Sequence, residues 1–213
     1  MKKITLADGT QIYELEYREL RTSITELVKE VNPNAQSFAI QQRTERVFNE
    51  IKLRTIKDAK KALQEYRLKA KTMTNPALVK EKHKSNRLGR NISVSGMPKP
   101  STTDFEAHAI ISGSNQYAKA ARAILARYKI RIDDPINGVW LPNFARNVPH
   151  DKMPDAAAHR SIHTVQYYLN LDEVLADVNS KEDLVDVLSK IRTRLVQGRF
   201  PYQAGDEIDV EDW

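Results

Sequence analysis

Four of the five histidines in this chain of 213 residues lie between positions 108 and 163. His159 and His163 are four residues apart, a spacing at which two imidazoles on one face of a helix can share a divalent ion. His108 lies in a short apolar stretch, from which it can supply a third nitrogen and leave open positions for water and phosphate. The alternative for the pair is one core and one surface histidine, because spacing alone does not bring three residues together. His150 has no such neighbours and is interpreted as a loop residue.

The elements expected to position these histidines are short. Their predicted order is a strand at 105–111, a helix at 115–128, turns at 133–138, a strand at 139–141 and a loop at 143–154. Asp155 is expected to cap a helix that carries the histidine pair and ends near Leu171. A last amphipathic helix is predicted at 183–195, and the acidic tail from Gln203 is expected to be mobile.

The N-terminal half is predicted to be helical. Its expected elements are a hairpin around Asp8-Gly9, a helix at 15–31, a longer helix at 35–71, and a polar linker or surface loop at 80–100. Asn32-Pro33-Asn34 and Asn75-Pro76 are expected to end the two helices. We therefore expect an α+β chain that is mostly helical, with a helical region at 1–95 and a second domain at 101–213.

The net charge of +6 is unevenly distributed. Thirteen Lys or Arg stand against three acidic residues from Lys52 to Arg90, whereas residues 101–213 hold thirteen basic and seventeen acidic residues. This basic segment can be a nucleic-acid-binding surface, since Lys and Arg neutralise phosphates, or a solvated charged helix. Tyr66 is its one aromatic residue, which favours a duplex over a stacked single strand.

The composition excludes several classes of site. The chain has no cysteine, so it has neither disulfides nor thiolate metal ligands. Its apolar runs are too short to cross a membrane, and we expect no membrane insertion. Residues 1–11 lack the apolar core of a signal peptide, so export would require another route.

Three sequence blocks resemble the AHH nucleases of the HNH and endonuclease VII superfamily, over about residues 104–175. The blocks are Phe105-Glu106-Ala107-His108-Ala109-Ile110-Ile111, Asn137-Gly138-Val139-Trp140-Leu141-Pro142, and His159-Arg160-Ser161-Ile162-His163-Thr164 with Tyr167-Tyr168. The resemblance implies a ββα-metal (His-Me finger) unit that holds a divalent ion, Mg or Zn, with Mn or Ni as further candidates. It implies that the metal ligands are His108, His159 and His163.

The resemblance also implies supporting roles. Asn137 matches an asparagine that ties the strand hairpin together. Arg160 is a candidate phosphate contact, although a plain surface charge is the favoured interpretation. Two short strands and a helix make a thin core, so a bound metal is expected to contribute to stability and a chelator to lower the melting temperature.

The chain departs from the family signature at Ala109, where a second histidine would be the general base. Alanine cannot accept a proton, so the chain as it stands is expected to be inactive. Either the chain is a natural degenerate member or the catalytic histidine was replaced. The intact remainder of the motif favours a deliberate replacement.

AHH nucleases are found mainly as C-terminal toxins of bacterial polymorphic toxin systems. The resemblance therefore implies an endonuclease effector that enters competitor bacteria through a specialised secretion system and acts in the target-cell cytoplasm. It also implies a cognate immunity protein. DNA is the favoured substrate. The alternatives are RNA as substrate, a non-catalytic nucleic-acid-binding or partner-binding protein with a native Ala109, and an interaction module in the N-terminal half.

Overall fold

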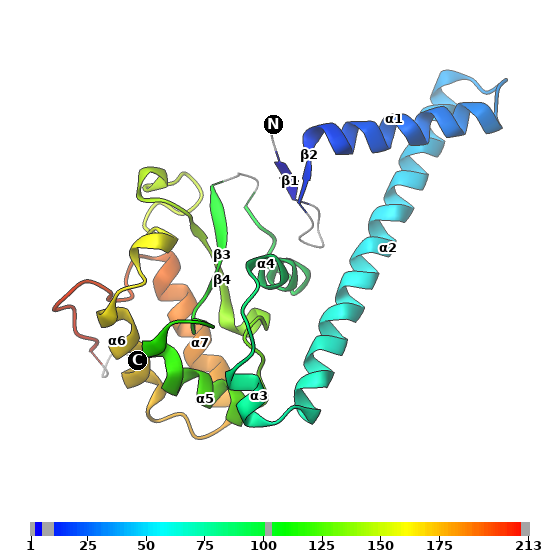
Figure 1. Cartoon of the computed structure of the whole chain (residues 1–213). Helices are drawn as coiled ribbons and strands as arrows, with labels where there is room; N and C mark the ends of the chain where they lie inside the picture. Colours follow the sequence, from blue (N-terminus) through cyan, green and yellow to red (C-terminus); the bar gives the residue numbers. More distant parts are fainter. Residues whose placement is uncertain (1–2, 6–10, 101–103, 210–213) are drawn as a thin grey trace.

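A computed structural model describes residues 3–5, 11–100 and 104–209 of the chain. A long helical arm adjoins a body in which helices cover both faces of a two-stranded sheet (Figure 1). The expected α+β, mostly helical class is confirmed. Among the described residues, none of the helices combines the length and apolar character that crossing a lipid bilayer requires.

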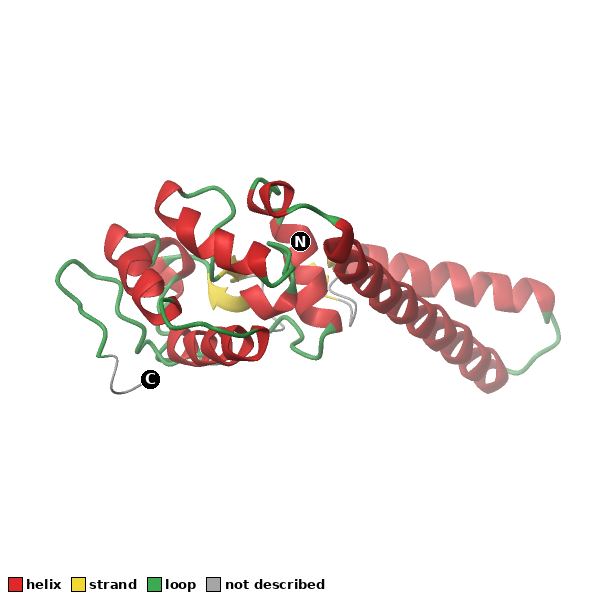
Figure 2. Ribbon diagram, turned by 90° about the horizontal axis from the view of Figure 1, so that it is seen from below, coloured by secondary structure: helices red, strands yellow, loops and turns green. Residues whose placement is uncertain are grey.

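The N-terminal arm consists of a small antiparallel sheet and two helices. The strands β1 (Lys3–Thr5) and β2 (Gln11–Tyr13) pair as expected, although the predicted Asp8-Gly9 turn lies outside the described residues. The helices α1 (Glu14–Val31) and α2 (Ser37–Thr72) follow, close to their predicted bounds. Ile24, Val28 and Phe48 form the small apolar cluster that holds α1 against α2. The two helices project away from the body in both views (Figures 1 and 2).

Residues 80–100 were expected to form a linker or surface loop, and this prediction is wrong. The helix α3 (Asn75–Val79) is followed by α4 (Ser85–Val94), which packs on the sheet with Leu88 and Ile92 fully buried. Gly89 had suggested a loop, but a Cβ at this position would lie 2.8 Å from the ring of Trp140. The lack of a side chain at Gly89 therefore lets α4 pack closely against the sheet, and the glycine does not break the helix.

The central sheet consists of β3 (Phe105–Ala109) and β4 (Gly138–Pro142), which pair antiparallel with His108 opposite Val139. Since side chains alternate along a strand, Phe105, Ala107 and Ala109 face α4. The other face meets α5 (Lys119–Arg127), α6 (Val165–Leu175) and α7 (Lys181–Val196). Short 3-10 turns complete the body, at Gln116–Ala118, Pro135–Asn137, Ala145–Asn147 and His159–Ser161.

The helix predicted to be capped by Asp155 is capped nine residues later. Thr164 caps α6 by accepting a hydrogen bond from the Tyr167 backbone N–H, so His159 and His163 precede the helix. Residues 156–158 before them are buried, the backbone of Ala158 is extended, and the Asp155 carbonyl packs against Gly198. The prediction that His159 and His163 lie on one face of a helix is therefore wrong, although the two residues remain neighbours in space.

The core of the body is larger than the thin core predicted from the sequence. The side chains of α5, α6 and α7 merge with residues of both strands into one apolar cluster. The acidic tail, expected to be mobile from Gln203, also packs against this body as far as it is described. Ile208 is buried, and Asn170 donates a hydrogen bond of 2.8 Å to the carbonyl of Asp206.

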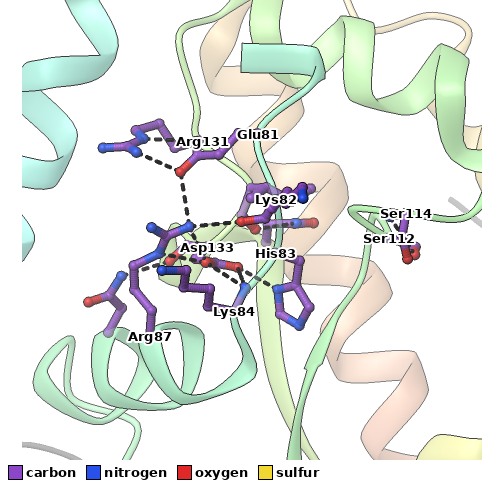
Figure 3. A network of polar contacts seen from close by, with 12 residues as sticks. Glu81, Lys82, His83, Lys84, Arg87, Ser112, Ser114, Arg131 and Asp133 are labelled. Atoms are coloured by element: carbon purple, nitrogen blue, oxygen red, sulfur yellow. Dashed lines mark hydrogen bonds and ion pairs between the residues drawn. The ribbon is translucent and has the colours of Figure 1, made fainter. Parts of the chain in front are cut away.

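Charged side chains join the end of α2 to the body. Arg67 donates two hydrogen bonds, of 2.8 and 2.9 Å, to the carboxylate of Asp134. Arg131 lies 3.7 Å above the ring centre of Tyr66 and donates two further bonds to Glu81 (Figure 3). Together with the packing of α4 on β3, these contacts join the end of α2 and α4 to the body.

Candidate metal and catalytic site

Three imidazoles from separate elements meet beside the sheet. His108 lies on β3, His159 in the 3-10 turn that follows Ala158, and His163 just before α6. One nitrogen of each lies within 4.8 Å of one nitrogen of both others, and the ring centres are 5.0–5.1 Å apart. The structure therefore brings together the three histidines that the sequence had singled out.

Hydrogen bonds orient the ring of His108, which is 0% exposed. Tyr167 donates its hydroxyl proton to the Ile110 carbonyl at 2.9 Å, which leaves its oxygen as an acceptor for His108 Nε2–H at 3.3 Å. The proton on Nε2 leaves a lone pair on Nδ1. This Nδ1 is buried and has no hydrogen-bond partner among the described residues. A buried nitrogen that lacks a donor is suited to bind a cation.

The other two imidazoles also use one ring nitrogen for a polar neighbour. His159 Nδ1 lies 3.1 Å from the carboxylate of Glu106, two residues before His108 and on the same face of β3. His163 Nδ1 lies 3.0 Å from the hydroxyl of Tyr168. Each ring therefore keeps Nε2 for a ligand, and a carboxylate behind a histidine is a frequent support of metal sites.

The surroundings keep the three rings neutral. Burial lowers the pKa of His108 well below its ordinary value, and the neighbouring His159 and His163 lower it further. Burial also lowers the pKa of His159, against the opposing effect of Glu106. Partial burial beside His159 lowers the pKa of His163 to about 4. Neutral imidazole is the form that binds metal, so all three rings are competent ligands at neutral pH.

A pocket of about 320 Å³ opens next to His159 and His163. Ala109, the segment from Ser112 to Asn115 and Tyr168 also line it. Arg122 fixes this segment by donating hydrogen bonds of 2.8 and 2.7 Å to the carbonyls of Ser112 and Asn115. The pocket gives a substrate a place beside the imidazoles of His159 and His163.

The same pocket is lined by His83, which sequence analysis missed. It is the one histidine outside the 108–163 cluster, and it lies in a segment that was interpreted as a linker. Because it stands between two basic residues, Lys82 and Lys84, it was also counted as part of the basic segment. Its proximity is evident from the electrostatics, because a charge on His83 lowers the pKa of all three clustered imidazoles.

The remaining predicted residues lie around this site. Asn137 is fully buried, accepts a hydrogen bond from the Ile111 backbone N–H at 2.8 Å, and donates to the carbonyls of Ile111 and Ile132. Arg160 is exposed, with its guanidinium 4.4 Å from the ring centre of Phe144 and 4.0 Å from Glu106. His150 lies in a loop and contacts the ring of Phe105, outside the pocket.

The donor set fits a divalent cation. Three neutral imidazole nitrogens, one of them buried without another partner, could hold a borderline ion such as zinc and leave coordination positions toward the pocket. His83 is not among the imidazoles whose nitrogens lie within 4.8 Å of one another. It therefore borders the site without belonging to the three-nitrogen group.

Comparison with known proteins agrees with this geometry. The model of the AHH proteins, a nuclease family of the HNH/ENDO VII superfamily with conserved AHH, matches residues 87–195. This range is slightly more than half of the chain and runs from α4 to α7, with all three clustered histidines inside it. No curated protein and no solved structure matches the chain significantly. The chain thus belongs to the AHH nucleases of the HNH/ENDO VII superfamily, and its body is a nuclease domain.

Proposed function

We propose that the chain is a metal-dependent endonuclease that hydrolyses phosphodiester bonds of DNA. The observation that carries this proposal is the convergence of three neutral imidazoles, each with one nitrogen free, at the edge of an open pocket. In this proposal His108, His159 and His163 are the ligands of a single divalent ion. The family membership supplies the reaction class, and the pocket supplies the place for the phosphodiester.

The donor chemistry favours some ions over others. Magnesium prefers oxygen ligands, whereas imidazole suits zinc, nickel and other first-row ions. We therefore place zinc and nickel ahead of manganese and magnesium for this site. A divalent ion held there would bind a phosphate oxygen and stabilise the negative charge that develops as the ester bond breaks.

The hydrolysis also needs a base that takes a proton from the attacking water. Position 109, adjacent to His108 and exposed to the pocket, is where the family signature places a histidine. With Ala109 in this place we expect a rate lower by about two to four powers of ten. The three ligands are separate residues, so metal binding is expected to survive this change.

The exposed basic residues of α2 are proposed to contact the DNA backbone. They lie on α2 between positions 52 and 71 and comprise Lys52, Arg54, Lys57, Lys60, Lys61, Lys69 and Lys71. Contacts of this kind position a duplex without reading its sequence. The site chemistry is the same for RNA, which is the second candidate substrate.

We further propose, from the family resemblance, that the nuclease is an antibacterial toxin. It would be delivered by a secretion system, act in the cytoplasm of the target cell, and be neutralised by an immunity protein. An acidic immunity protein would complement the basic α2. Protection of cells that express the Ala109→His form by a neighbouring gene product would support this role.

The nuclease proposal is tested by comparing the chain with its Ala109→His form. Both are incubated with supercoiled plasmid and, separately, with tRNA, in zinc, manganese, nickel or magnesium, with and without EDTA. We expect the Ala109→His form to cut plasmid at least a hundred times faster than the Ala109 chain, and EDTA to stop it. His108→Ala in the same background is expected to lose both cleavage and the metal-induced rise in melting temperature.

Each outcome has a distinct meaning. Cleavage of tRNA alone would move the substrate from DNA to RNA. Binding of metal and DNA without cleavage in any form would replace the nuclease with a non-catalytic binding protein. An unchanged melting curve in metal and in EDTA would contradict the three-histidine site itself.

A further inference from the structure

We propose that His83, held by Asp133, is a general base of this nuclease, and that it supports cleavage by the chain that carries Ala109. The inference rests on the proposed nuclease function. It concerns a residue that lies before the family match and outside the histidine cluster. Three features of the structure carry it, namely the support of His83, its position in the pocket and the tautomer of its ring.

The support begins with Asp133, whose side chain is 0% exposed. Its carboxylate accepts hydrogen bonds from His83 Nδ1 at 2.5 Å, from Arg87 Nε at 2.6 Å and from the backbone N–H of Lys84 (Figure 3). The backbone of Asp133 is fixed as well, because Asn91 donates to its carbonyl at 2.8 Å. A buried carboxylate with these donors holds the imidazole in one orientation.

His83 itself stands at the wall of the pocket that contains Ala109, His159 and His163. Its side chain is 28% exposed, so solvent reaches it. The loop at Gly113, which lines the same pocket, approaches His83 closely, since a Cβ at Gly113 would lie 2.6 Å from the Cβ of His83. The absence of a side chain at Gly113 leaves this space to His83, which is confined between the loop and Asp133.

The carboxylate also determines which ring nitrogen carries the proton. Asp133 accepts from Nδ1–H, so Nε2 of His83 keeps its lone pair. No hydrogen bond among the described residues engages this nitrogen. A carboxylate behind Nδ1 and a free Nε2 toward the substrate is the arrangement in which histidine acts as a base. The carboxylate also stabilises the imidazolium once it forms.

The proposed hydrolysis needs no reactant besides the phosphodiester and water. Nε2 of His83 takes a proton from a water molecule in the pocket as the water oxygen bonds to phosphorus. The phosphorus–oxygen bond to one nucleoside breaks, and the departing oxygen takes a proton from solvent. His83 then returns its proton to solvent, which leaves a phosphate monoester, an alcohol and the starting enzyme.

Position 109 and His83 reach the same pocket from different elements. Ala109 ends β3 on the face that packs against α4, and His83 lies two residues before α4 begins. A base on either element can therefore serve one phosphodiester. We infer that the two positions are alternative bases, and that an alanine at 109 leaves the slower route through His83.

The test measures cleavage by four forms of the full chain, each loaded with zinc or manganese: the parent, His83→Asn, Ala109→His, and the double variant. The asparagine amide can still donate to Asp133 from the position of Nδ1 but cannot accept a proton. We expect the parent to cleave slowly and His83→Asn to reduce kcat a hundredfold or more, with unchanged KM, metal affinity and melting temperature. In the Ala109→His background the same substitution should cost less than tenfold. His150→Gln, outside the pocket, is the matched control and should retain the parental rate.

Failure of the inference differs from failure of the nuclease proposal. Parental cleavage by His83→Asn, or cleavage by Ala109→His beside a wholly inactive parent, would overturn the role of His83 and leave the nuclease function intact. A loss of rate matched by an equal loss of metal affinity would make His83 a support of the ligands and would also overturn it. No cleavage by any of the four forms would reject the nuclease proposal and the inference together.

Discussion

Each clustered imidazole has a polar neighbour that decides which nitrogen is free. For His108 the neighbour is a buried tyrosine, for His159 it is Glu106, and for His163 it is Tyr168. Such neighbours fix the tautomer and the direction of the ring, and a carboxylate also raises the basicity of the ligand. The strength of the metal site should therefore depend on residues that never touch the ion.

Glu106→Gln tests this dependence. The amide oxygen can still accept from His159 Nδ1–H but carries no charge, so we expect zinc affinity to fall about tenfold, and about a hundredfold for Glu106→Ala. Titration against a competing chelator measures the change in the purified full chain. Glu173→Gln removes an exposed carboxylate from α6, away from the three histidines, and should leave the affinity unchanged. Equal affinities for the parent and Glu106→Ala would show that the carboxylate does not support the site.

At the scale of single residues, the sequence predicted the clustered histidines but not the side chains that orient them. The three histidines and Asn137 stand in recognisable blocks, so their identity could be read directly. His83 could not be found this way, because its significance comes from Asp133, fifty residues later in the chain. Pairing across that distance depends on how α4 packs on the sheet, which no local pattern records.

The contact between α4 and the sheet is the element on which the site depends. It brings His83 and Ala109 to the same pocket and covers one face of β3 with Leu88 and Ile92. On the sheet, Gly138 of β4 forms part of this contact. A Cβ at Gly138 would lie 2.7 Å from Cδ1 of Ile92 and 2.8 Å from Leu88. The backbone of Gly138 is extended, with φ −134°, so any residue can adopt its conformation. The need for glycine there is steric.

A double-mutant cycle measures how tightly the two elements pack. Gly138→Ala overfills the contact and is expected to destabilise the protein by about 1–3 kcal/mol. Ile92→Val removes the nearest methyl group and alone should cost about 0.5–1.5 kcal/mol. Combined, the two changes should cost less than their sum, because valine vacates the space that the alanine needs. Urea denaturation of the four forms gives the free energies, and strict additivity would contradict the close contact.

Local sequence patterns predicted the bounds of some helices correctly and those of others incorrectly. The bounds of α1, α2 and α7 were predicted within a few residues, because each has a long apolar periodicity and clear end signals. The segment at 80–100 was misjudged since its glycine and polar residues resemble a linker. The helix start was misplaced at Asp155, although Thr164, which precedes Tyr167 by three residues, carries an equally good cap signal. Tertiary packing therefore determines that Thr164, and not Asp155, caps the helix.

At the scale of the whole molecule, side-chain contacts hold the end of the arm against the body. The bidentate pair between Arg67 and Asp134 and the stack of Arg131 on Tyr66 fix the end of α2 against the body. With 36 residues, α2 is about 54 Å long, which exceeds one turn of a duplex. Its exposed lysines therefore lie at a defined distance from the pocket.

The salt dependence of DNA binding tests whether the arm shares the substrate. Lys57→Gln with Lys60→Gln removes two exposed charges one helical turn apart. If both contact phosphates, the slope of log affinity against log salt should become shallower by about two, since each phosphate contact contributes about 0.9. Binding is measured on the Ala109 chain in EDTA, so that cleavage does not intervene. Lys181→Gln with Lys190→Gln makes the same change in net charge on α7, and its slope should match the parent. An equal effect of both pairs would mean that only the total charge matters, and the arm would then be free to bind a protein partner instead.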